Sequence, residues 1–173
     1  MDQICLSEKL CTGCAACYNA CPVSAISMQP DTKGFLYPVI NQEKCIDCGL
    51  CQKTCPQIDR RKPCQEGVLF AAIAIDDNLR KKSSSGGVFS LLAEQVIRTG
   101  GVVFGAALNQ NNQVQHTFAD NLAALSRLRG SKYVQSEIGR TYTKTKELLD
   151  EDIYVLFSGT PCQISGLRRF LNK

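Results

Sequence analysis

One pattern of cysteines occurs twice in this chain of 173 residues, and it limits the possible folds more than any other feature. Each copy reads C-x2-C-x2-C-x3-C-P, and all five positions recur after 34 residues. The first copy consists of Cys11, Cys14, Cys17, Cys21 and Pro22, and the second of Cys45, Cys48, Cys51, Cys55 and Pro56. An odd total of 11 cysteines and the lack of a recognisable secretory signal argue against a disulfide framework. The pattern therefore predicts that the thiols bind metal.

The spacing is that of bacterial ferredoxins with two 4Fe-4S clusters, in which the fourth cysteine of each run ligates the cluster of the other run. We therefore predict one cluster on Cys11, Cys14, Cys17 and Cys55, and a second on Cys45, Cys48, Cys51 and Cys21. Two-residue gaps let a tight loop wrap three thiolates around one cluster, and the proline after the fourth cysteine ends the helical turn. The apolar residues expected to cover the clusters include Ile26, Leu36, Val39, Ile40 and Ile46.

Structural zinc is the alternative, because zinc sites also use C-x2-C pairs. Such sites need two pairs, whereas here three cysteines at this spacing recur twice with a trailing Cys-Pro, which favours iron and sulfide. Cys5 and Cys64 lie outside both runs. We expect them to be ordinary thiols, buried or at the surface, with binding of a further group as the alternative.

Charge and hydropathy exclude other classes of protein. The formal net charge is +4, but two bound clusters with their eight thiolates would bring it to about zero, and the chain has no tryptophan to stack on a base. Nucleic-acid binding is therefore not expected. The longest apolar run, Val68–Ile75, is far shorter than the ~20 residues that span a bilayer. The sequence thus predicts a cytoplasmic protein without a transmembrane segment.

A polar linker at Arg60–Pro63 follows the cysteine runs, so we predict domains at residues 1–62 and 63–173. The second domain alternates strand and helix patterns. The predicted strands are Val68–Ile75, Val102–Leu108, Gln113–Ala119 and Ile153–Phe157, and the predicted helices are Val88–Arg98, 120–128, Ile138–Leu149 and Gln163–Leu171. The predicted fold class is mixed: a small ferredoxin-like two-cluster domain of α+β type, followed by an α/β domain.

Two loops of the second domain, 83–87 and 158–162, precede helix N-termini. Helix N-termini expose N–H groups that favour phosphate or other anions, although Ser, Thr and Gly also serve there as caps and turn formers. Cys162 lies just inside its helix, where a cysteine pKa is lowered, and it is a candidate reactive thiol with an inert thiol as the alternative. His116 is the only histidine and is expected to be structural.

Three stretches, SSSGGVFSLLAEQVI, RGSKYVQSEIG and FSGTPCQISGLRRFL in this order, resemble the family of coenzyme F-420 (deazaflavin) hydrogenase/dehydrogenase beta subunits. The resemblance covers nearly the whole chain, and GTPCQ (159–163) and GSKYVQS (130–136) are its most specific parts. It implies an iron–sulfur flavoprotein that binds FAD and exchanges electrons with a hydride-accepting partner. Family members continue beyond the GTPCQ helix, so the resemblance implies that the second domain is an incomplete α/β flavin-type domain, truncated relative to the family.

The resemblance also implies a flavin site. Backbone N–H groups of the two loops would approach the cofactor, Lys132 would supply positive charge, and Cys162 would be the catalytic candidate. The implied cofactor-binding residues are Ser85, Gly86, Gly87, Lys132, Tyr133, Gly159, Thr160, Pro161 and Gln163.

These observations together predict an oxidoreductase module that passes electrons between two 4Fe-4S clusters and a flavin. Its expected partner is a redox protein or a small-molecule hydride carrier such as the deazaflavin coenzyme, and membership of a larger redox complex is a further expectation. The alternative is a ferredoxin-like electron carrier without flavin, whose C-terminal segment only docks a partner.

Overall fold

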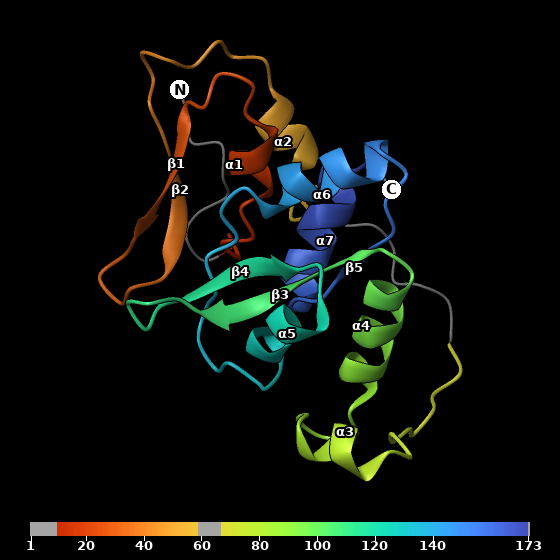
Figure 1. Ribbon diagram of the computed structural model, residues 1–173. Coiled ribbons are helices and arrows are strands. Elements are labelled where there is room, and N and C mark those ends of the chain that lie inside the picture. The colour runs from red at the N-terminus through yellow and green to blue at the C-terminus, as the bar shows by residue number, and fades with distance from the viewer. Residues whose placement is uncertain (1–9, 59–66, 173) are drawn as a thin grey trace. The chain divides into compact units, whose positions relative to one another are not determined.

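The computed structural model describes residues 10–58 and 67–172 (Figure 1). Cys5, Cys64 and the predicted linker at Arg60–Pro63 lie outside the described residues. The chain divides into two compact units. The first contains the described residues of 1–61 together with 137–143 and 159–172, and the second contains 67–136 and 144–158. The expected division at residue 62 thus differs from these units, because two segments of the C-terminal half belong to the first unit.

The first unit contains two short helices and a β-hairpin (Figure 1). The helices are α1 (Ala16–Ala20) and α2 (Leu50–Thr54), and the strands are β1 (Ile26–Pro30) and β2 (Leu36–Ile40). The strands pair antiparallel, with Met28 opposite Pro38. At the turn, the Asp31 carboxylate accepts hydrogen bonds from the backbone N–H groups of Lys33 and Phe35, both at 2.8 Å. This hairpin was not predicted from the sequence, because its strands are short and carry prolines.

The cysteine repeat is also a repeat of backbone conformation. Gly13 and Asp47, 34 residues apart, have φ angles of 63° and 49°. Ala15 and Gly49, at the same separation, have φ angles of 59° and 69° and form the N-caps of α1 and α2. Left-handed backbone is unfavourable for Ala and Asp, so both copies keep the same wrapped loop even where the residue is not glycine.

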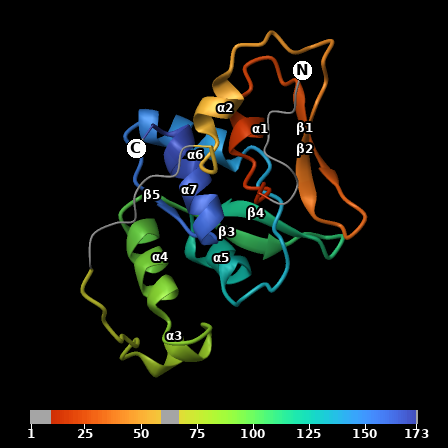
Figure 2. The same ribbon diagram turned by 180° about the vertical axis from the view of Figure 1, so that it is seen from behind.

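A third helix of the first unit comes from the C-terminal end of the chain. Helix α7 (Pro161–Phe170) packs against α1 and α2 (Figures 1 and 2). Its N-terminus is closed by a capping box, in which the Thr160 amide donates to the Gln163 side-chain oxygen at 2.9 Å. The predicted helix Gln163–Leu171 is therefore confirmed with a start two residues earlier, at Pro161.

The second unit contains a three-stranded sheet of order β4-β3-β5. Its elements are α3 (Asp77–Lys81), α4 (Val88–Arg98), β3 (Val102–Leu108), β4 (Val114–Ala119), α5 (Leu122–Leu125), a 3-10 turn (Ser126–Leu128), the greater part of α6 (Thr141–Asp150) and β5 (Val155–Phe157). β3 pairs antiparallel with β4 and parallel with β5. The predicted hairpin is confirmed, and its turn contains Asn112 in the left-handed region at φ 57°.

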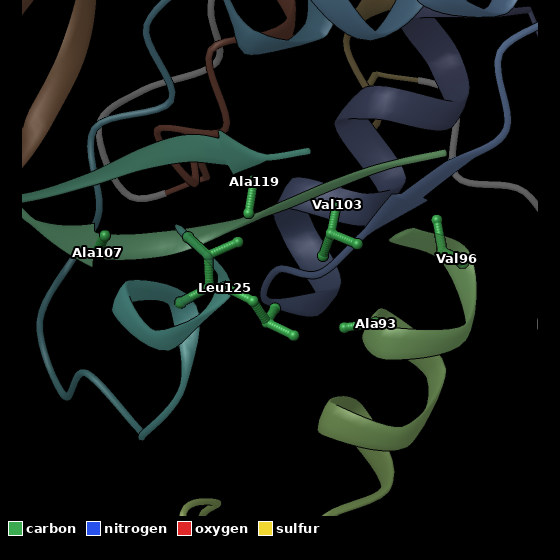
Figure 3. Packing of buried hydrophobic residues seen from close by; sticks show 7 residues of the cluster. Ala93, Val96, Val103, Ala107, Ala119 and Leu125 are labelled. Atoms are coloured by element: carbon green, nitrogen blue, oxygen red, sulfur yellow. The ribbon is translucent and has the colours of Figure 1, made fainter. Parts of the chain in front are cut away.

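The core of the second unit forms where α4, α5 and the 3-10 turn pack on the sheet. Figure 3 shows how side chains from α4, the sheet and α5 meet there. The buried residues of this cluster are Ala93, Val96, Val103, Ala107, Ala119, Leu125 and Leu128. Val103 and Ala107 lie on one face of β3, and Ala93 and Val96 lie one turn apart on α4, so that these residues face the same core.

The prediction of a buried strand at Val68–Ile75 was wrong. This segment has no regular secondary structure, and the side chains of Leu69 and Ile75 are 97% and 95% exposed. The segment is held at Ala74, whose amide donates to the Gly86 carbonyl oxygen at 2.7 Å. Two boundaries also need correction: α6 begins at Thr141 rather than Ile138, and Asn121 rather than Asp120 caps α5. Among the described residues, none of the helices has the length and hydrophobicity that crossing a membrane requires.

Candidate iron–sulfur centre

Two cavities of the first unit are lined by the eight cysteines of the repeat. The larger cavity, of about 390 Å³, is lined by the four cysteines that we call site B: Cys21, Cys45, Cys48 and Cys51. The smaller cavity is lined by the four that we call site A: Cys11, Cys14, Cys17 and Cys55. Each site therefore contains three cysteines of one copy and the fourth cysteine of the other copy.

The two short helices explain this exchange of the fourth cysteine. Helix α1 carries Cys17 to site A and ends at Cys21, which turns to extended backbone before Pro22 and lines site B. Helix α2 does the reverse, because it carries Cys51 to site B and ends at Cys55 in site A. Four residues of helix rise by about 6 Å, so the two sites lie about one helical turn apart along each helix.

Burial and nearby hydrogen-bond donors act in opposite directions on the thiols of both sites. Burial raises the pKa of Cys14 to about 11, while hydrogen bonds from the Ala16 amide and the Thr12 side chain act in the opposite direction. Charge on Cys55 and Cys11 raises the same pKa further, which shows that thiols from both copies lie close to Cys14. Donors aimed at a buried sulfur stabilise its thiolate form, and N–H···S bonds also help to set the potential of a bound cluster.

Site B has the same chemistry. Burial raises the pKa of Cys51, with the amides of Gln52 and Cys51 itself as opposing donors and with charge from Cys48 and Cys45 as a further cause of the rise. The Cys21 sulfur accepts a hydrogen bond from the Ala25 amide at 3.2 Å. Cys51 lies in the first turn of α2, where backbone N–H groups lack an i−4 partner, whereas the Gln52 amide also donates to the Gly49 carbonyl oxygen at 3.1 Å.

The arrangement of the donor side chains favours a cluster over a single ion. In residues 10–58 and 67–172, His, Cys, Asp and Glu side chains nowhere form a group of three or more that could hold one metal ion. A tetrahedral zinc site needs four donors at about 2.0–2.3 Å from one centre. In a cubane each of the four thiolates binds a different iron, so the ligands surround the cluster and do not converge on one ion.

The apolar residues expected to cover the clusters were predicted in part. Ile26, Ile40 and Ile46 line the site B cavity, although Ile46 is 60% exposed. Leu36 is half-buried and Val39 is exposed, and neither lines a cavity. Pro38, which was not expected to cover a cluster, lines site A from strand β2. The missed hairpin is the reason, since its register decides which side chains face the cysteines.

The residues that the resemblance assigned to a flavin fall into both units. Ser85, Gly86, Gly87, Lys132 and Tyr133 belong to the second unit, and Gly159, Thr160, Pro161, Cys162 and Gln163 belong to the first. The Lys132 ammonium donates to the carbonyl oxygens of Arg127 and Arg129 at 3.1 and 2.7 Å, and burial lowers the pKa of Lys132. The Tyr133 side chain is 94% exposed.

The glycines and the capping residues of this set have local packing roles. A Cβ atom at Gly86 would lie 2.5 Å from the Ala72 carbonyl oxygen, so only glycine fits against that segment. Thr160 and Gln163 form the capping box of α7, and the Thr160 hydroxyl lies 3.1 Å from the half-buried Cys162 sulfur. The assignment of these residues to a flavin remains a prediction.

Comparison with known proteins gives the same result for the cysteine region. A family profile described as a 4Fe-4S dicluster domain matches residues 10–57, and a second profile of the same description matches residues 37–113. An uncharacterized polyferredoxin-like protein of Methanocaldococcus jannaschii is 36% identical over 89 residues, 43% of this chain and 53% of the relative. The cysteine region of this chain is therefore similar to 4Fe-4S dicluster domains.

Two further relatives are named as parts of redox enzymes. The polyferredoxin-like subunit of an aliphatic sulfonate oxidoreductase of Pyrococcus furiosus is 43% identical over 51 residues, 30% of this chain and 28% of the relative. One of the subunits of the F(420)H(2) dehydrogenase of Methanosarcina mazei is 22% identical over 175 residues, 94% of this chain and 49% of the relative. The chain spans about half or less of the length of these relatives.

Proposed function

We propose that this polyferredoxin-like electron carrier binds one 4Fe-4S cluster in site A and one in site B. Electrons would move from one cluster to the other and then to a redox partner. Each cluster would supply one-electron chemistry, because a cubane changes its charge by one on reduction. The protein would supply eight thiolates, amide donors such as that of Ala25, and apolar walls that limit water.

The observation that carries this proposal is the mixed composition of each cavity. Three cysteines at x2 spacing wrap one cavity, and the fourth arrives from the other copy through α1 or α2. The cysteine spacing alone predicts the same arrangement, in which the fourth cysteine of each copy belongs to the site of the other copy. Because α1 and α2 each contribute one ligand to each site, the two clusters would be separated by little more than a helical turn, which suits electron transfer between them.

The test is anaerobic reconstitution with iron and sulfide, followed by metal analysis and EPR spectroscopy of the reduced protein. We expect eight iron atoms per chain and two EPR signals. Cys55→Ala should remove the cluster of site A and leave that of site B, whereas the matched variant Cys162→Ala should leave both. Loss of only the site B signal in Cys55→Ala would refute the exchanged ligands, and two zinc ions in place of iron would refute the function.

A second candidate function adds a flavin and a hydride carrier. The alignment with the F(420)H(2) dehydrogenase protein of Methanosarcina mazei favours it, since this alignment extends over 94% of the chain and therefore beyond the cysteine region. In that case electrons from the clusters would be paired on FAD and exchanged as hydride with a deazaflavin-type carrier, within a larger redox complex. Absorbance of the protein after reconstitution with FAD tests this. Near-stoichiometric flavin bands after gel filtration support it, and a spectrum with cluster bands alone refutes it.

A further inference from the structure

Helix α7 makes its closest contact with the cysteine loops at a residue without a side chain. A Cβ atom at Gly166 would lie 3.0 Å from the Cys14 sulfur, 3.2 Å from the Cys14 Cβ and 3.4 Å from the Ala16 Cβ. Gly166 is buried, and Cys14 is one of the four cysteines of site A. The backbone of α7 therefore lies directly against one proposed cluster ligand.

The contacts on either side of Gly166 fix the position of α7. The Tyr142 hydroxyl donates to the Gln163 carbonyl oxygen at 2.8 Å, and the Tyr142 side chain is fully buried. The Tyr142 ring also lies against Phe170, with 6.2 Å between the ring centroids. The capping box at Thr160 holds the start of the same helix. Because both ends of α7 are tied, the helix has little freedom to move away from Cys14.

We infer that Gly166 is a positioning residue for site A: the missing side chain leaves the space in which the Cys14 thiolate can bind iron. This inference rests on the proposed function, since it concerns the geometry of a cluster ligand. A free Cys14 side chain can turn away from an added methyl group. A sulfur bound to iron cannot turn, because the other three ligands of site A fix the cluster.

Gly166→Ala is the direct test. Partners that orient metal ligands typically change metal affinity by about 10–100-fold when they are altered. We expect the site A cluster of Gly166→Ala to be lost to an iron chelator about tenfold faster than in the parent protein, with a changed EPR signal. The site B cluster should keep its EPR signal and its rate of loss. The two signals are assigned with the single variants Cys55→Ala and Cys48→Ala.

Two neighbouring positions of α7 provide controls. Ser165→Ala introduces an alanine at the neighbouring position of α7, which is exposed, and it should leave both clusters unchanged. Leu167→Ala removes a buried side chain from the same helix without pressing on Cys14. If Leu167→Ala and Gly166→Ala change the site A cluster equally, general loosening of α7 explains the effect and the inference is overturned.

A double variant keeps the inference testable if Gly166→Ala folds poorly. In Cys14→Gly, both Cys14 atoms closest to the added methyl group are gone, and only the ordinary contact with Ala16 remains. Adding Gly166→Ala to Cys14→Gly should leave the site B cluster unchanged and should not lower the melting temperature, because alanine favours the helix once the clash is gone. A lower melting temperature or a loss at site B would overturn the inference. A parent protein without iron would refute the proposed function itself. If the parent protein holds two clusters and the site A cluster of Gly166→Ala keeps the parent EPR signal and rate of loss, only the role of Gly166 is refuted.

Discussion

The side-chain amide of Asn19 donates a hydrogen bond to the carbonyl oxygen of Gly139 at 2.9 Å, across 120 positions of sequence. The same amide donates to the Ala15 carbonyl oxygen, and its oxygen accepts from the amide and hydroxyl of Thr143 at 3.3 and 3.1 Å. Asn19 lies on α1, the helix with one cysteine in each site. Asn19 thus joins segment 137–143 to the cysteine-rich unit, together with Arg140, whose guanidinium donates to the Tyr18 carbonyl oxygen at 3.0 Å.

Replacing Asn19 by alanine should destabilise this unit. The change removes hydrogen bonds and leaves the Gly139 carbonyl and the Thr143 amide without their partner in a mostly buried position. We expect the free energy of unfolding to fall by about 2 kcal/mol. Chemical denaturation of the cluster-loaded protein measures the effect. Asn111→Ala, in an exposed turn, is the control and should change the value by less than about 0.5 kcal/mol. An equal change in both variants would contradict the role of Asn19.

The spacing predicts two groups of four thiols, and the same two groups line the two cavities of the first unit. That these thiols ligate clusters stays a prediction. The contribution of α7 and of segment 137–143 to the same unit could not be predicted in this way. It depends on Asn19, Tyr142 and Gly166, which are single residues with no period and no recurring motif. Both segments overlap stretches that carry the family resemblance, RGSKYVQSEIG and FSGTPCQISGLRRFL. A resemblance in sequence does not say which surface of the protein these segments contact.

The second unit shows a different limit of sequence reasoning. The apolar run Val102–Leu108 and the 3.6-residue periodicity of Val88–Arg98 predict β3 and α4 correctly, and both elements contribute residues to the same core. The run VLFAAIAI at Val68–Ile75 has the composition of a buried strand but no strand partner among the described residues. Burial of an apolar run depends on its neighbours in space, and composition does not specify them.

One substitution made at two positions tests the exposure of that run. Leu69 is 97% exposed, whereas Leu125 is fully buried in the core of the second unit. Leu69→Ala should change the free energy of unfolding by less than about 0.5 kcal/mol, and Leu125→Ala should lower it by about 3 kcal/mol. Thermal unfolding of the two variants provides the comparison. A cost at Leu69 similar to that at Leu125 would mean that the segment is buried after all.

His116 should make the stability of the second unit depend on pH. Its ring accepts from the Ser136 hydroxyl at 2.9 Å and donates to the Ser158 carbonyl oxygen at 3.0 Å, while stacking on Phe157. Burial lowers the pKa of His116 below 6.5, and the hydrogen bond to Ser158 opposes this shift only in part. The neutral ring is therefore the form that the folded protein prefers.

The direction of the pH effect follows from this shift. Below pH 6.5 the unfolded chain binds a proton on this histidine before the folded chain does, so acid favours unfolding. The contribution of His116 to stability is complete above pH 6.5 and is lost as the pH falls toward the lowered pKa of the folded state. Denaturation at several pH values between 5 and 8, compared with His116→Gln, isolates this effect. A difference between the two proteins that stays constant over this range would contradict it.

The two proposed clusters should differ in their resistance to chelation. Site A contains the buried Cys17, and α7 rests on Cys14. Site B contains the exposed Cys48, and its apolar wall includes Ile46 and Leu50, which are themselves exposed. Solvent exposure is one of the factors that set the properties of an iron–sulfur centre. A chelator in solution should therefore reach the iron of site B first.

A time course of EPR spectra under anaerobic conditions, with a strong iron chelator present, measures this difference. We expect two phases of iron loss, with the site B signal decaying several-fold faster than the site A signal. Asn19→Ala removes the hydrogen bonds between α1 and segment 137–143, whose Tyr142 holds α7 through the Gln163 carbonyl oxygen, and it should therefore bring the two rates closer together. Faster loss of the site A signal in the parent protein would show that α7 does not shield its cluster.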